Sequence, residues 1–201
     1  MNKPYSESCN QNRDPILDVL KHQLGVSKSV LEIGSGTGQH AVYFAKNLPH
    51  LVWHTSDCRP YLSGIQMWIE EANLDNVRIP IELDVNQPTW PDHDIDAIFT
   101  ANSVHIMNAE EVVSLFAGAG ENLNVGGLFI VYGPFNYNRC YTSESNARFD
   151  NWLKSRDPLS GIKDFEEIDQ LAQKAAMQLL DDIEMPANNR LLIWRRIVSS
   201  N

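Results

Sequence analysis

The sequence predicts an α/β fold with a Rossmann-like, doubly wound and mostly parallel sheet of about seven strands and helices on both faces. First, short apolar and β-branched runs alternate with helical stripes through residues 29–132. Second, a glycine cluster lies between the first of these runs and the helix that follows it. Third, two strand-like runs lie close together near the end of the chain, and they predict a terminal antiparallel strand pair.

The first predicted element is a helix that begins near Asp14. Asp14 is a polar cap, and Pro15 suits a first helical turn because the N–H that proline lacks would have no partner there. Gly25 ends this helix. No linker, repeat or low-complexity tract interrupts the chain, so we expect a single domain over 1–201. Its expected parts are a polar N-terminal segment (1–13), a lid-like helix (14–25) and the core (26–201).

The remaining elements follow from apolar spacing and from turn residues between the runs. Asn108, with Glu111 three residues later, is a capping-box variant that begins one of the helices. The stretch 137–161 shows no regular pattern. The predicted helices cover residues 39–48, 60–72, 108–123 and 164–175. The predicted strands cover residues 29–33, 51–55, 79–85, 95–100, 128–132, 178–184 and 191–198.

Composition narrows the classes of partner. The chain has 16 Lys and Arg against 26 Asp and Glu, a formal net charge of −10, and this field repels phosphate backbones, so we expect no nucleic-acid partner. The three cysteines are scattered without a Cys-x-x-Cys pair, which disfavours a disulfide scaffold or a metal site and fits a reducing cytosol. No apolar run is long enough to cross a bilayer, and the first residues lack the apolar core of a signal peptide. We expect a soluble, cytoplasmic protein with no membrane partner and no metal.

The strongest local signal is the glycine-rich segment 32–38, between the first predicted strand and the next helix. Glycine lets the backbone turn sharply and approach a ligand, and a helix N-terminus favours an anionic group. A dinucleotide loop needs its third glycine at the position of Gln39. The pattern here, Glu-x-Gly-x-Gly-x-Gly, resembles motif I of class I methyltransferases that use S-adenosylmethionine (SAM); a tight turn without a ligand is the alternative. The candidate cofactor-binding residues of this segment are Glu32, Gly34, Ser35, Gly36 and Gly38.

Further cofactor candidates follow the second, third and fourth predicted strands. Asp57 can accept hydrogen bonds from both hydroxyls of an unphosphorylated ribose, with Cys58 beside it; the alternative is that Asp57 caps the next helix. Asp84 and Val85 end the third strand, where a carboxylate and an apolar contact suit an adenine, or where Asp84 is a surface residue. Asn102 leaves the fourth strand at the carboxyl edge, where such sheets bind ligands, at a position that often lines the methionine end of SAM.

Three residues are candidates for the catalytic contact with a methyl acceptor. His105 can take a proton from the acceptor because an unperturbed imidazole titrates near neutral pH, or it is simply a half-buried loop histidine. The amides of Asn188 and Asn189 can orient an acceptor. Alternatively, both residues form a tight turn between the last two strands, since asparagine tolerates left-handed backbone geometry.

Five short motifs carry a narrower resemblance. Through them the sequence resembles the DUF938 family, also called the methyltransferase-like 26 family, from about Arg13 to Arg196. The resemblance implies a SAM-methyltransferase-like fold and SAM as cofactor, with S-adenosylhomocysteine (SAH) as product, and it brings no established acceptor. The motifs are 12–16 (Asn-Arg-Asp-Pro-Ile), 132–135 (Tyr-Gly-Pro-Phe), 143–146 (Ser-Glu-Ser-Asn), 149–150 (Phe-Asp) and 185–189 (Met-Pro-Ala-Asn-Asn).

Arg13, in the first of these motifs, completes the candidate site. Its planar guanidinium suits a carboxylate, and an N-terminal helix that folds over the sheet would bring it to the carboxylate of SAM; a surface ion pair is the alternative. We interpret the chain as a SAM-dependent methyltransferase that transfers a methyl group in line to a small-molecule or protein acceptor, without a metal. The alternatives are a non-catalytic SAM-binding protein and a nicotinamide oxidoreductase, which Gln39 and the lack of a Tyr-x-x-x-Lys pair oppose.

Overall fold

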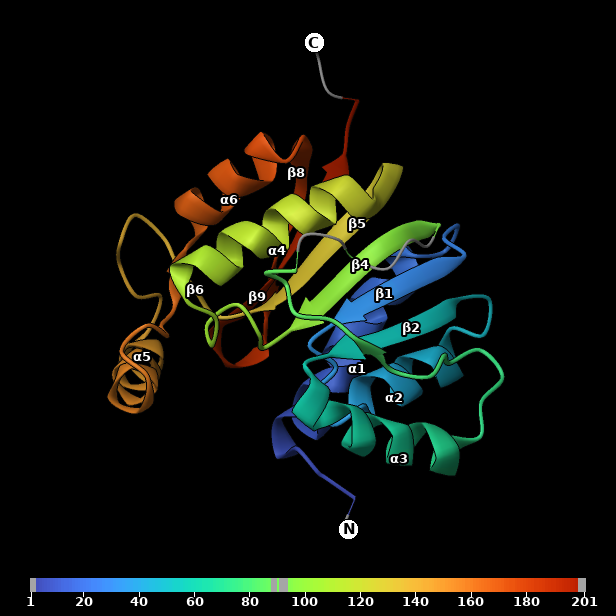
Figure 1. Ribbon diagram of the computed structural model, residues 1–201. Helices are drawn as coiled ribbons and strands as arrows, with labels where there is room; N and C mark the ends of the chain where they lie inside the picture. Colours follow the sequence, from blue (N-terminus) through green and yellow to red (C-terminus); the bar gives the residue numbers. More distant parts are fainter. Residues whose placement is uncertain (1–2, 88–89, 91–93, 199–201) are drawn as a thin grey trace.

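A computed structural model describes residues 3–87, 90 and 94–198, and a seven-stranded sheet forms its centre (Figure 1). The strand order is β3-β2-β1-β4-β5-β9-β8. The pairs from β3 to β5 are parallel, and β9 is antiparallel to both β5 and β8, so the predicted fold class is confirmed. The strands are β1 (Ser29–Ile33), β2 (Val52–Asp57), β3 (Ile81–Glu82), β4 (Ile95–Ala101), β5 (Leu123–Gly133), β8 (Met177–Met185) and β9 (Asn189–Arg196).

Helices cover both faces of the sheet (Figure 1). On one face lie α1 (Glu7–Gln23), α2 (Gln39–Asn47) and α3 (Leu62–Ala72), which a 3-10 turn, η1 (Arg59–Tyr61), precedes. On the other face lie α4 (Ala109–Asn122) and α6 (Phe165–Lys174). Beyond one edge of the sheet lie α5 (Glu144–Arg156), the short strands β6 (Phe135–Asn136) and β7 (Lys163–Asp164), and the 3-10 turn η2 (Pro186–Asn188).

Alternation along the central strands produces two hydrophobic cores. Successive side chains of a strand point to opposite faces. In β4, Ala97 and Phe99 pack against α1, α2 and α3, whereas Ile98 packs against α4 and α6. All five residues of β1 are buried, as expected for a strand with a core on each side. The sheet is therefore fixed in register, and so are the loops that follow its strands.

The N-terminal helix begins earlier than the sequence predicts. Ser6, not Asp14, caps α1: its Oγ accepts a hydrogen bond from the backbone N–H of Cys9 at 3.4 Å. Pro15 lies inside the helix, where it removes one backbone hydrogen bond. Contacts of the first turns with α2 offset that loss. The predicted helix start at residue 14 is therefore wrong, and residues 7–13 of the expected polar segment are helical.

Two further differences concern α5 and β3. The stretch 137–161, in which no pattern was visible, contains α5, whose buried side chains are Asn146, Asp150 and Leu153. Two of these three are polar, so the helix has no apolar stripe. The strand expected over 79–85 contains only the two residues of β3, so Asp84 and Val85 lie after it. Pro80 has no N–H for a ladder, which keeps the strand from beginning earlier.

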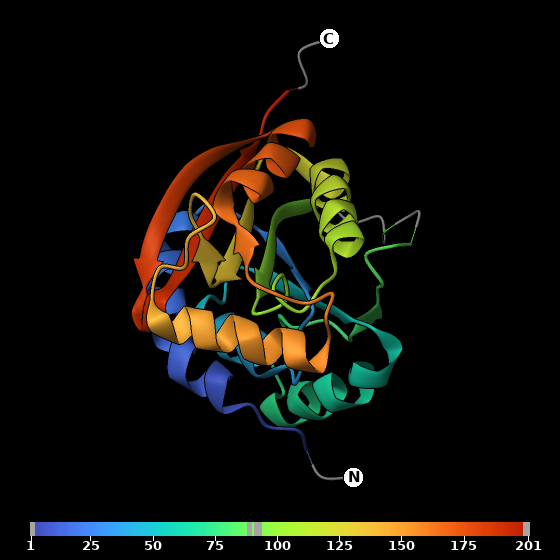
Figure 2. The ribbon, with the colours of Figure 1, turned by 90° about the vertical axis from the view of Figure 1, so that its left-hand side faces the viewer.

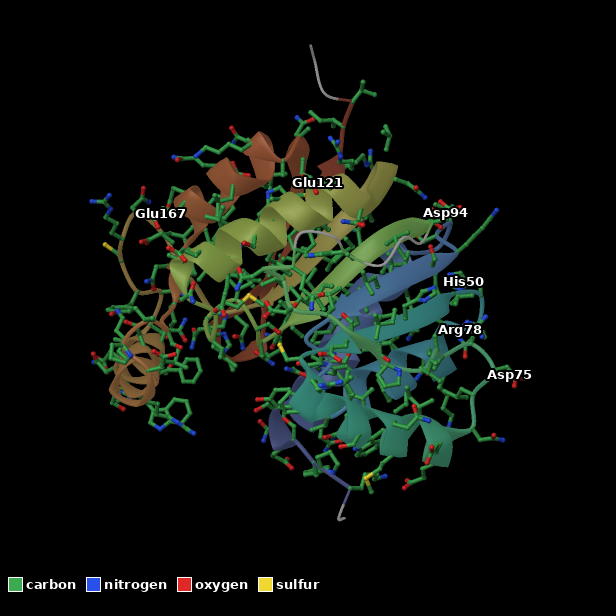
Figure 3. All side chains as sticks on the ribbon, in the orientation of Figure 1. His50, Asp75, Arg78, Asp94, Glu121 and Glu167 are labelled. Carbon is green, nitrogen blue, oxygen red and sulfur yellow. The ribbon has the colours of Figure 1, made fainter. Side chains whose placement is uncertain are left out.

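The two edges of the sheet differ in what surrounds them. Asp94, which immediately precedes β4, lies at the amino-end edge of the sheet, together with the exposed residues His50, Asp75 and Arg78 (Figure 3). At the carboxyl edge, α5 runs across the ends of the strands (Figure 2). No helix of the described residues is long and apolar enough to span a membrane. The described residues also contain no group of three or more metal-ligating side chains.

Candidate functional site

The glycine loop 34–38 lies at the carboxyl end of β1. Gly34, Gly36 and Gly38 all have positive φ, at 69°, 59° and 89°. A Cβ on Gly34 would lie 2.7 Å from the Oγ of Ser103, and a Cβ on Gly38 would lie 3.1 Å from the Cα of Ile65. Gly34 and Gly38 therefore require glycine both for their backbone conformation and for the close approach of the loop after β4 and of α3, whereas Gly36 requires it for its backbone conformation alone.

Glu32, in β1, is hydrogen-bonded to the glycine loop from inside the protein. Its side chain is buried in β1, and its Oε2 accepts hydrogen bonds from the Oγ of Ser35 at 3.0 Å and from the indole N–H of Trp53 at 3.1 Å. Burial raises the pKa of this carboxyl to about 7, although the two hydrogen bonds oppose the shift. Glu32 thus connects the loop to β2 through the interior.

Asp57 ends β2 directly beside the loop. Its Oδ2 accepts a hydrogen bond from the backbone N–H of Gly36 at 2.7 Å, and its Oδ1 accepts one from the N–H of Cys58 at 2.7 Å. Burial raises the pKa of Asp57, and these two bonds partly offset that rise. The N-cap of η1 is Cys58 and no side chain caps this turn, so the capping alternative for Asp57 is wrong. Each carboxylate oxygen retains a lone pair for a ligand.

The residues expected near the adenine lie next along the same edge. The Sγ of Cys58 lies 4.0 Å from the carbonyl oxygen of Leu83, and burial is the main cause that raises the pKa of this thiol. Asp84 is exposed, and its Oδ1 accepts a hydrogen bond from the N–H of Asn86 at 2.9 Å. Val85 is buried in the core beneath. The structure therefore brings Asp57, Cys58 and the end of β3 together.

Asn102 and Tyr132 connect the ends of β4 and β5. Asn102 has a left-handed backbone, with φ at 58°, and its N–H donates to the carbonyl oxygen of Tyr132 at 2.9 Å. Burial raises the pKa of the Tyr132 phenol, while hydrogen bonds with Asn12 and Asn189 lower it. Tyr132 thus links α1 and the β8–β9 hairpin at this edge.

The start of α1 packs against the N-terminus of α2, immediately after the glycine loop. The backbone N–H of Ser6 donates to Oε1 of Gln39 at 2.5 Å, and Nε2 of Gln39 donates to the carbonyl oxygen of Ser6 at 3.2 Å. His40 Nε2 and Asn12 Oδ1 are hydrogen-bonded at 2.7 Å. Sequence reasoning missed this set of contacts; Asn12 in the motif 12–16 was the available signal.

Arg13 follows Asn12 in the same helix. Its guanidinium carbon lies 4.5 Å from the ring centroid of Tyr43 in α2. Its Nε is buried and has no hydrogen-bond partner among the described residues, although Asp14 Oδ1 lies 3.8 Å away. The side chain is therefore held in place by the tyrosine ring while one of its donors remains unused.

His105 lies in the loop after β4 and is buried. Burial lowers the pKa of its imidazole to about 4, and the nearby charge of Lys163 adds to the shift. The ring contacts Phe149 of α5 edge to face, with 5.2 Å between centroids. Its carbonyl oxygen accepts a hydrogen bond from the N–H of Gly161 at 2.9 Å. At neutral pH the ring is uncharged, and it is a weak base.

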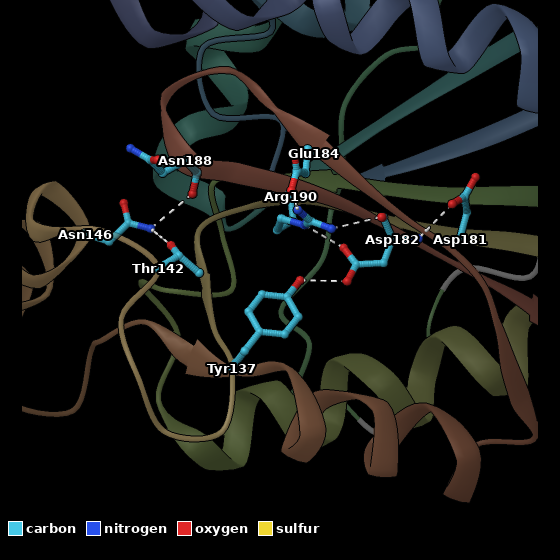
Figure 4. A network of polar contacts seen from close by, with 8 residues as sticks. All are labelled: Tyr137, Thr142, Asn146, Asp181, Asp182, Glu184, Asn188 and Arg190. Atoms are coloured by element: carbon cyan, nitrogen blue, oxygen red, sulfur yellow. Dashed lines mark hydrogen bonds and ion pairs between the residues drawn. The ribbon is translucent and has the colours of Figure 1, made fainter.

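Asn188 ends η2, and Asn189 is the first residue of β9. Asn188 connects the β8–β9 hairpin to α5 (Figure 4). The side-chain amide of Asn146 donates to the carbonyl oxygen of Asn188 at 3.1 Å, and the amide of Asn188 donates to Ser145 Oγ at 3.2 Å. Asn188 has a left-handed backbone, with φ at 58°, as the turn interpretation predicts. For Asn189 that interpretation is wrong: its backbone is extended, and Ala187 is the other left-handed residue, with φ at 59°. Asn189 donates from its side chain to the carbonyl oxygen of Pro186 at 3.1 Å.

A second set of contacts attaches the same hairpin to the segment before α5. The hydroxyl of Tyr137 donates to Asp182 Oδ2 at 2.8 Å, and Arg190 Nε donates to Asp182 Oδ1 at 2.7 Å (Figure 4). Burial and the hydrogen bond to Asp182 both raise the pKa of Tyr137. With the Asn146 and Asn188 contacts, these bonds attach the segment from Tyr137 to the first turn of α5 to the β8–β9 hairpin.

Solved structures with the same fold include methyltransferases, one of which is described as SAM-dependent. The methyltransferase SibL in its apo form matches with a TM-score of 0.80 at 20% identity, over 95% of this chain and 56% of that chain. An O-methyltransferase family protein from Burkholderia thailandensis matches with a TM-score of 0.82 at 15% identity, over 93% and 57% of the two chains. An O-methyltransferase family 2 protein from Planctomyces limnophilus, in complex with apigenin, matches with a TM-score of 0.81 at 18% identity, over 94% and 60%.

This chain spans a little more than half the length of those proteins, and the likeness shows a methyltransferase fold. The family assignment rests on nearly the whole sequence. Residues 3–196 match the family described as "Protein of unknown function (DUF938)", which confirms the resemblance carried by the short motifs. The chain belongs to the DUF938 family and has the fold of the SAM-dependent methyltransferases.

Proposed function

We propose that this protein is a SAM-dependent methyltransferase that acts on a small-molecule or protein acceptor. The single observation that carries the proposal is the hydrogen bond at 2.7 Å from the N–H of Gly36 to Asp57. It joins a glycine loop to an acidic side chain at the carboxyl ends of two adjacent strands, the place where open α/β sheets bind nucleotides. The methyltransferase fold of the solved structures supports the same function.

The residues of the loop fit the nucleoside part of SAM. A Cβ on Gly36 would meet no atom within 4 Å, so a ligand can approach the backbone at this residue. Asp57 would accept hydrogen bonds from the ribose hydroxyls with its remaining lone pairs. Cys58 and Val85 would contact the adenine, with Asp84 as the acceptor for its amino group.

The residues on the other side of the loop fit the methionine part. The buried Arg13 Nε has an unused donor, which would bind the carboxylate of SAM. Asn102, at the end of β4, would line the same part. The contacts of Ser6 and Gln39 hold the start of α1 beside the loop, so Arg13 does not have to travel far to reach a ligand.

SAM, when bound, would supply a methyl group on a positively charged sulfur. A lone pair of the acceptor would bond to the methyl carbon as the carbon–sulfur bond breaks, which leaves SAH. The protein contributes mainly by holding the acceptor in line and excluding water. Neutral His105 would accept a hydrogen bond from the acceptor, and its low pKa suits positioning better than proton removal. The Asn188 and Asn189 amides would orient the acceptor from the hairpin.

We also propose a single domain and a cytoplasmic location. The single domain is supported by the continuous sheet, since the two hydrophobic cores share its strands. The location is supported by the cysteines Cys9, Cys58 and Cys140, which are all free thiols, as a reducing compartment would keep them.

Calorimetric titration with SAH and with NADH tests the cofactor, and we expect SAH alone to bind. Binding of NADH without SAH would favour the nicotinamide alternative. A screen of candidate acceptors for SAH release then tests catalysis, with Asp57→Ala as the variant that should lose both binding and release. Tight SAH binding with no release from any acceptor would identify a non-catalytic SAM-binding protein.

A further inference from the structure

The short ladder of β6 and β7 lies beyond the end of β5, outside the main sheet. Asn136 and Asp164 are directly paired in this parallel ladder. Neighbouring residues of a strand point to opposite sides, and Phe135 points into the core on the α4 and α6 face. Asn136 therefore points away from that core, and Asp164 points to the same side of the ladder.

Both side chains have a buried oxygen that accepts no hydrogen bond. These atoms are Asn136 Oδ1 and Asp164 Oδ1, and neither has a partner among the described residues. Asn136 is 9% exposed. Asp164 is the N-cap residue of α6, yet its side chain makes no capping hydrogen bond. Buried acceptors are normally satisfied, so two adjacent unsatisfied oxygens indicate a missing donor.

The neighbouring cations do not supply this donor. Lys163 donates to the carbonyl oxygens of Met107 at 2.8 Å and Gly161 at 2.9 Å. Lys154 forms an ion pair with Asp150 at 2.6 Å. Within the described part of the chain, no cationic side chain comes within ion-pair distance of Asp164, so its charge is not neutralised locally.

This pair of oxygens lies next to the acceptor side of the candidate site. Gly161, two residues before Lys163, donates its N–H to the carbonyl oxygen of His105 at 2.9 Å. Gly133, at the other end of the connection to β6, lies beside the imidazole ring: a Cβ there would be 3.6 Å from Nδ1 of His105. Each strand of the ladder therefore begins two residues after a glycine that lies beside His105, the residue expected to face the acceptor.

We propose that Asn136 and Asp164 bind a positively charged nitrogen group, an ammonium or a guanidinium, of the methyl acceptor. This inference rests on the proposed methyltransferase function. An amide oxygen and a carboxylate can only accept hydrogen bonds, and an ammonium or guanidinium supplies several donors together with the opposite charge. The net charge of −10 favours the approach of such a cation. The group belongs either to a free amine or to a lysine or arginine side chain of a protein.

The test uses the full chain saturated with SAH and measures the binding of tyramine, histamine, agmatine and a lysine-containing tetrapeptide. Each probe is compared with its nearest uncharged analogue, 4-ethylphenol for tyramine. We expect at least one cation to bind tenfold or more tightly than its analogue, and Asp164→Asn to abolish that preference while SAH binding is unchanged. Glu167→Gln removes a charge from the exposed face of α6 and is the matched control (Figure 3).

The outcomes separate this inference from the proposed function. If SAH does not bind, the methyltransferase proposal fails first. If SAH binds and no cation is preferred over its analogue, the assignment of Asn136 and Asp164 is wrong. The apo Asp164→Asn variant should melt no lower than wild type, because the carboxylate makes no capping hydrogen bond and its buried Oδ1 has no partner among the described residues. A lower melting temperature with an unchanged cation preference would assign Asp164 to the stability of α6 instead. Preference for the tetrapeptide over the free amines would point to a protein acceptor.

Discussion

Two regions of the carboxyl edge differ in how their polar groups are satisfied. The cofactor side, made of the glycine loop 34–38 and the ends of β1 and β2, is closely bonded: Asp57 accepts two backbone N–H groups and Glu32 accepts two side-chain donors. The acceptor side, made of His105, α5 and the β6–β7 ladder, contains the unsatisfied oxygens of Asn136 and Asp164. The first region is preorganised by its own chain, whereas the second has buried oxygens that no described residue satisfies.

The largest effect on stability and on SAH binding is expected from Gly38→Ala, which changes the glycine loop of the cofactor side. At φ 89° a side chain is strained, and its Cβ would lie 3.1 Å from the Cα of Ile65, a backbone atom that cannot move alone. We expect a loss of about 1–3 kcal/mol in the free energy of unfolding from backbone strain, with a further loss from the clash. Urea denaturation measures it, and SAH titration should show at least tenfold weaker binding.

Gly36→Ala is the matched control for this substitution. Its φ of 59° imposes a similar strain, but a Cβ there meets no atom within 4 Å. Its effect on unfolding should therefore be smaller than that of Gly38→Ala, while its effect on SAH binding should be as large, because the added methyl occupies the space left for the ligand. Equal destabilisation by both substitutions would show that close packing against α3 is unimportant.

The second effect concerns pH and the buried Glu32. Its pKa is raised to about 7 in the folded protein, so between pH 4.5 and 7 the folded state binds more protons than the unfolded state. Stability from this group is therefore present at low pH and is lost as pH rises through 7. The free energy of unfolding of Glu32→Gln, relative to wild type, should therefore be higher by about 2–4 kcal/mol at pH 8 than at pH 4.5. Denaturation of both proteins at both pH values measures this change.

The same comparison must separate Glu32 from the buried histidines. His40 and His105 have pKa values lowered to about 4, so their contributions change in the opposite direction: stability from them is present above pH 6.5 and is lost as pH falls. The difference between wild type and Glu32→Gln cancels these terms. A difference that does not vary with pH would show that Glu32 is ionised like an exposed carboxyl.

The third effect is that of Asp57→Ala on both cofactor and loop. Loss of a charged hydrogen-bond acceptor should weaken SAH binding by about 1.5–3 kcal/mol. Because Gly36 and Cys58 also lose their acceptor, the apo protein should be destabilised as well. Asp57→Asn keeps one acceptor oxygen and should lie between wild type and Asp57→Ala in both titration and denaturation. Full SAH affinity in Asp57→Ala would remove Asp57 from the cofactor site.

The difference between the two regions also explains what the sequence could predict. The glycine loop, Asp57 and the strands around them follow from local spacing, since each signal lies within a few residues of the element that it defines. The terminal antiparallel pair was visible for the same reason. The fold class and the placement of the glycine loop beside Asp57 could therefore be predicted from the sequence alone.

The acceptor side was not accessible in this way. Helix α5 buries Asn146 and Asp150 along with Leu153, so its inward face does not show the apolar periodicity by which a helix is recognised. Its first turn is nevertheless marked by Ser143, whose Oγ accepts the N–H of Asn146 at 3.1 Å. The contact of Asn146 with Asn188 joins positions far apart in the sequence, and no local pattern specifies it.

The start of α1 illustrates the same limit on the cofactor side. Pro15 and Asp14 imitate a helix N-terminus, but the contacts of Ser6 with Gln39 and of Asn12 with His40 hold the preceding residues in helical conformation. The sequence alone predicted these residues to be a polar segment in front of a lid-like helix. In the fold they are already capped and packed, so ordering by the ligand should be limited to a small region around Arg13.

The smallest expected effect is therefore that of Arg13. Arg13→Ala should weaken SAH binding by about 1.5 kcal/mol or more if its free Nε binds the carboxylate. Lys21→Ala, at an exposed ion pair with Asp18 on the same helix, is the control and should bind normally. Hydrogen exchange should show increased protection with SAH at residues 9–14 and unchanged protection at residues 17–23. Uniform protection along α1, together with normal binding by Arg13→Ala, would mean that α1 is a fixed part of the fold and that Arg13 serves only to cover Tyr43.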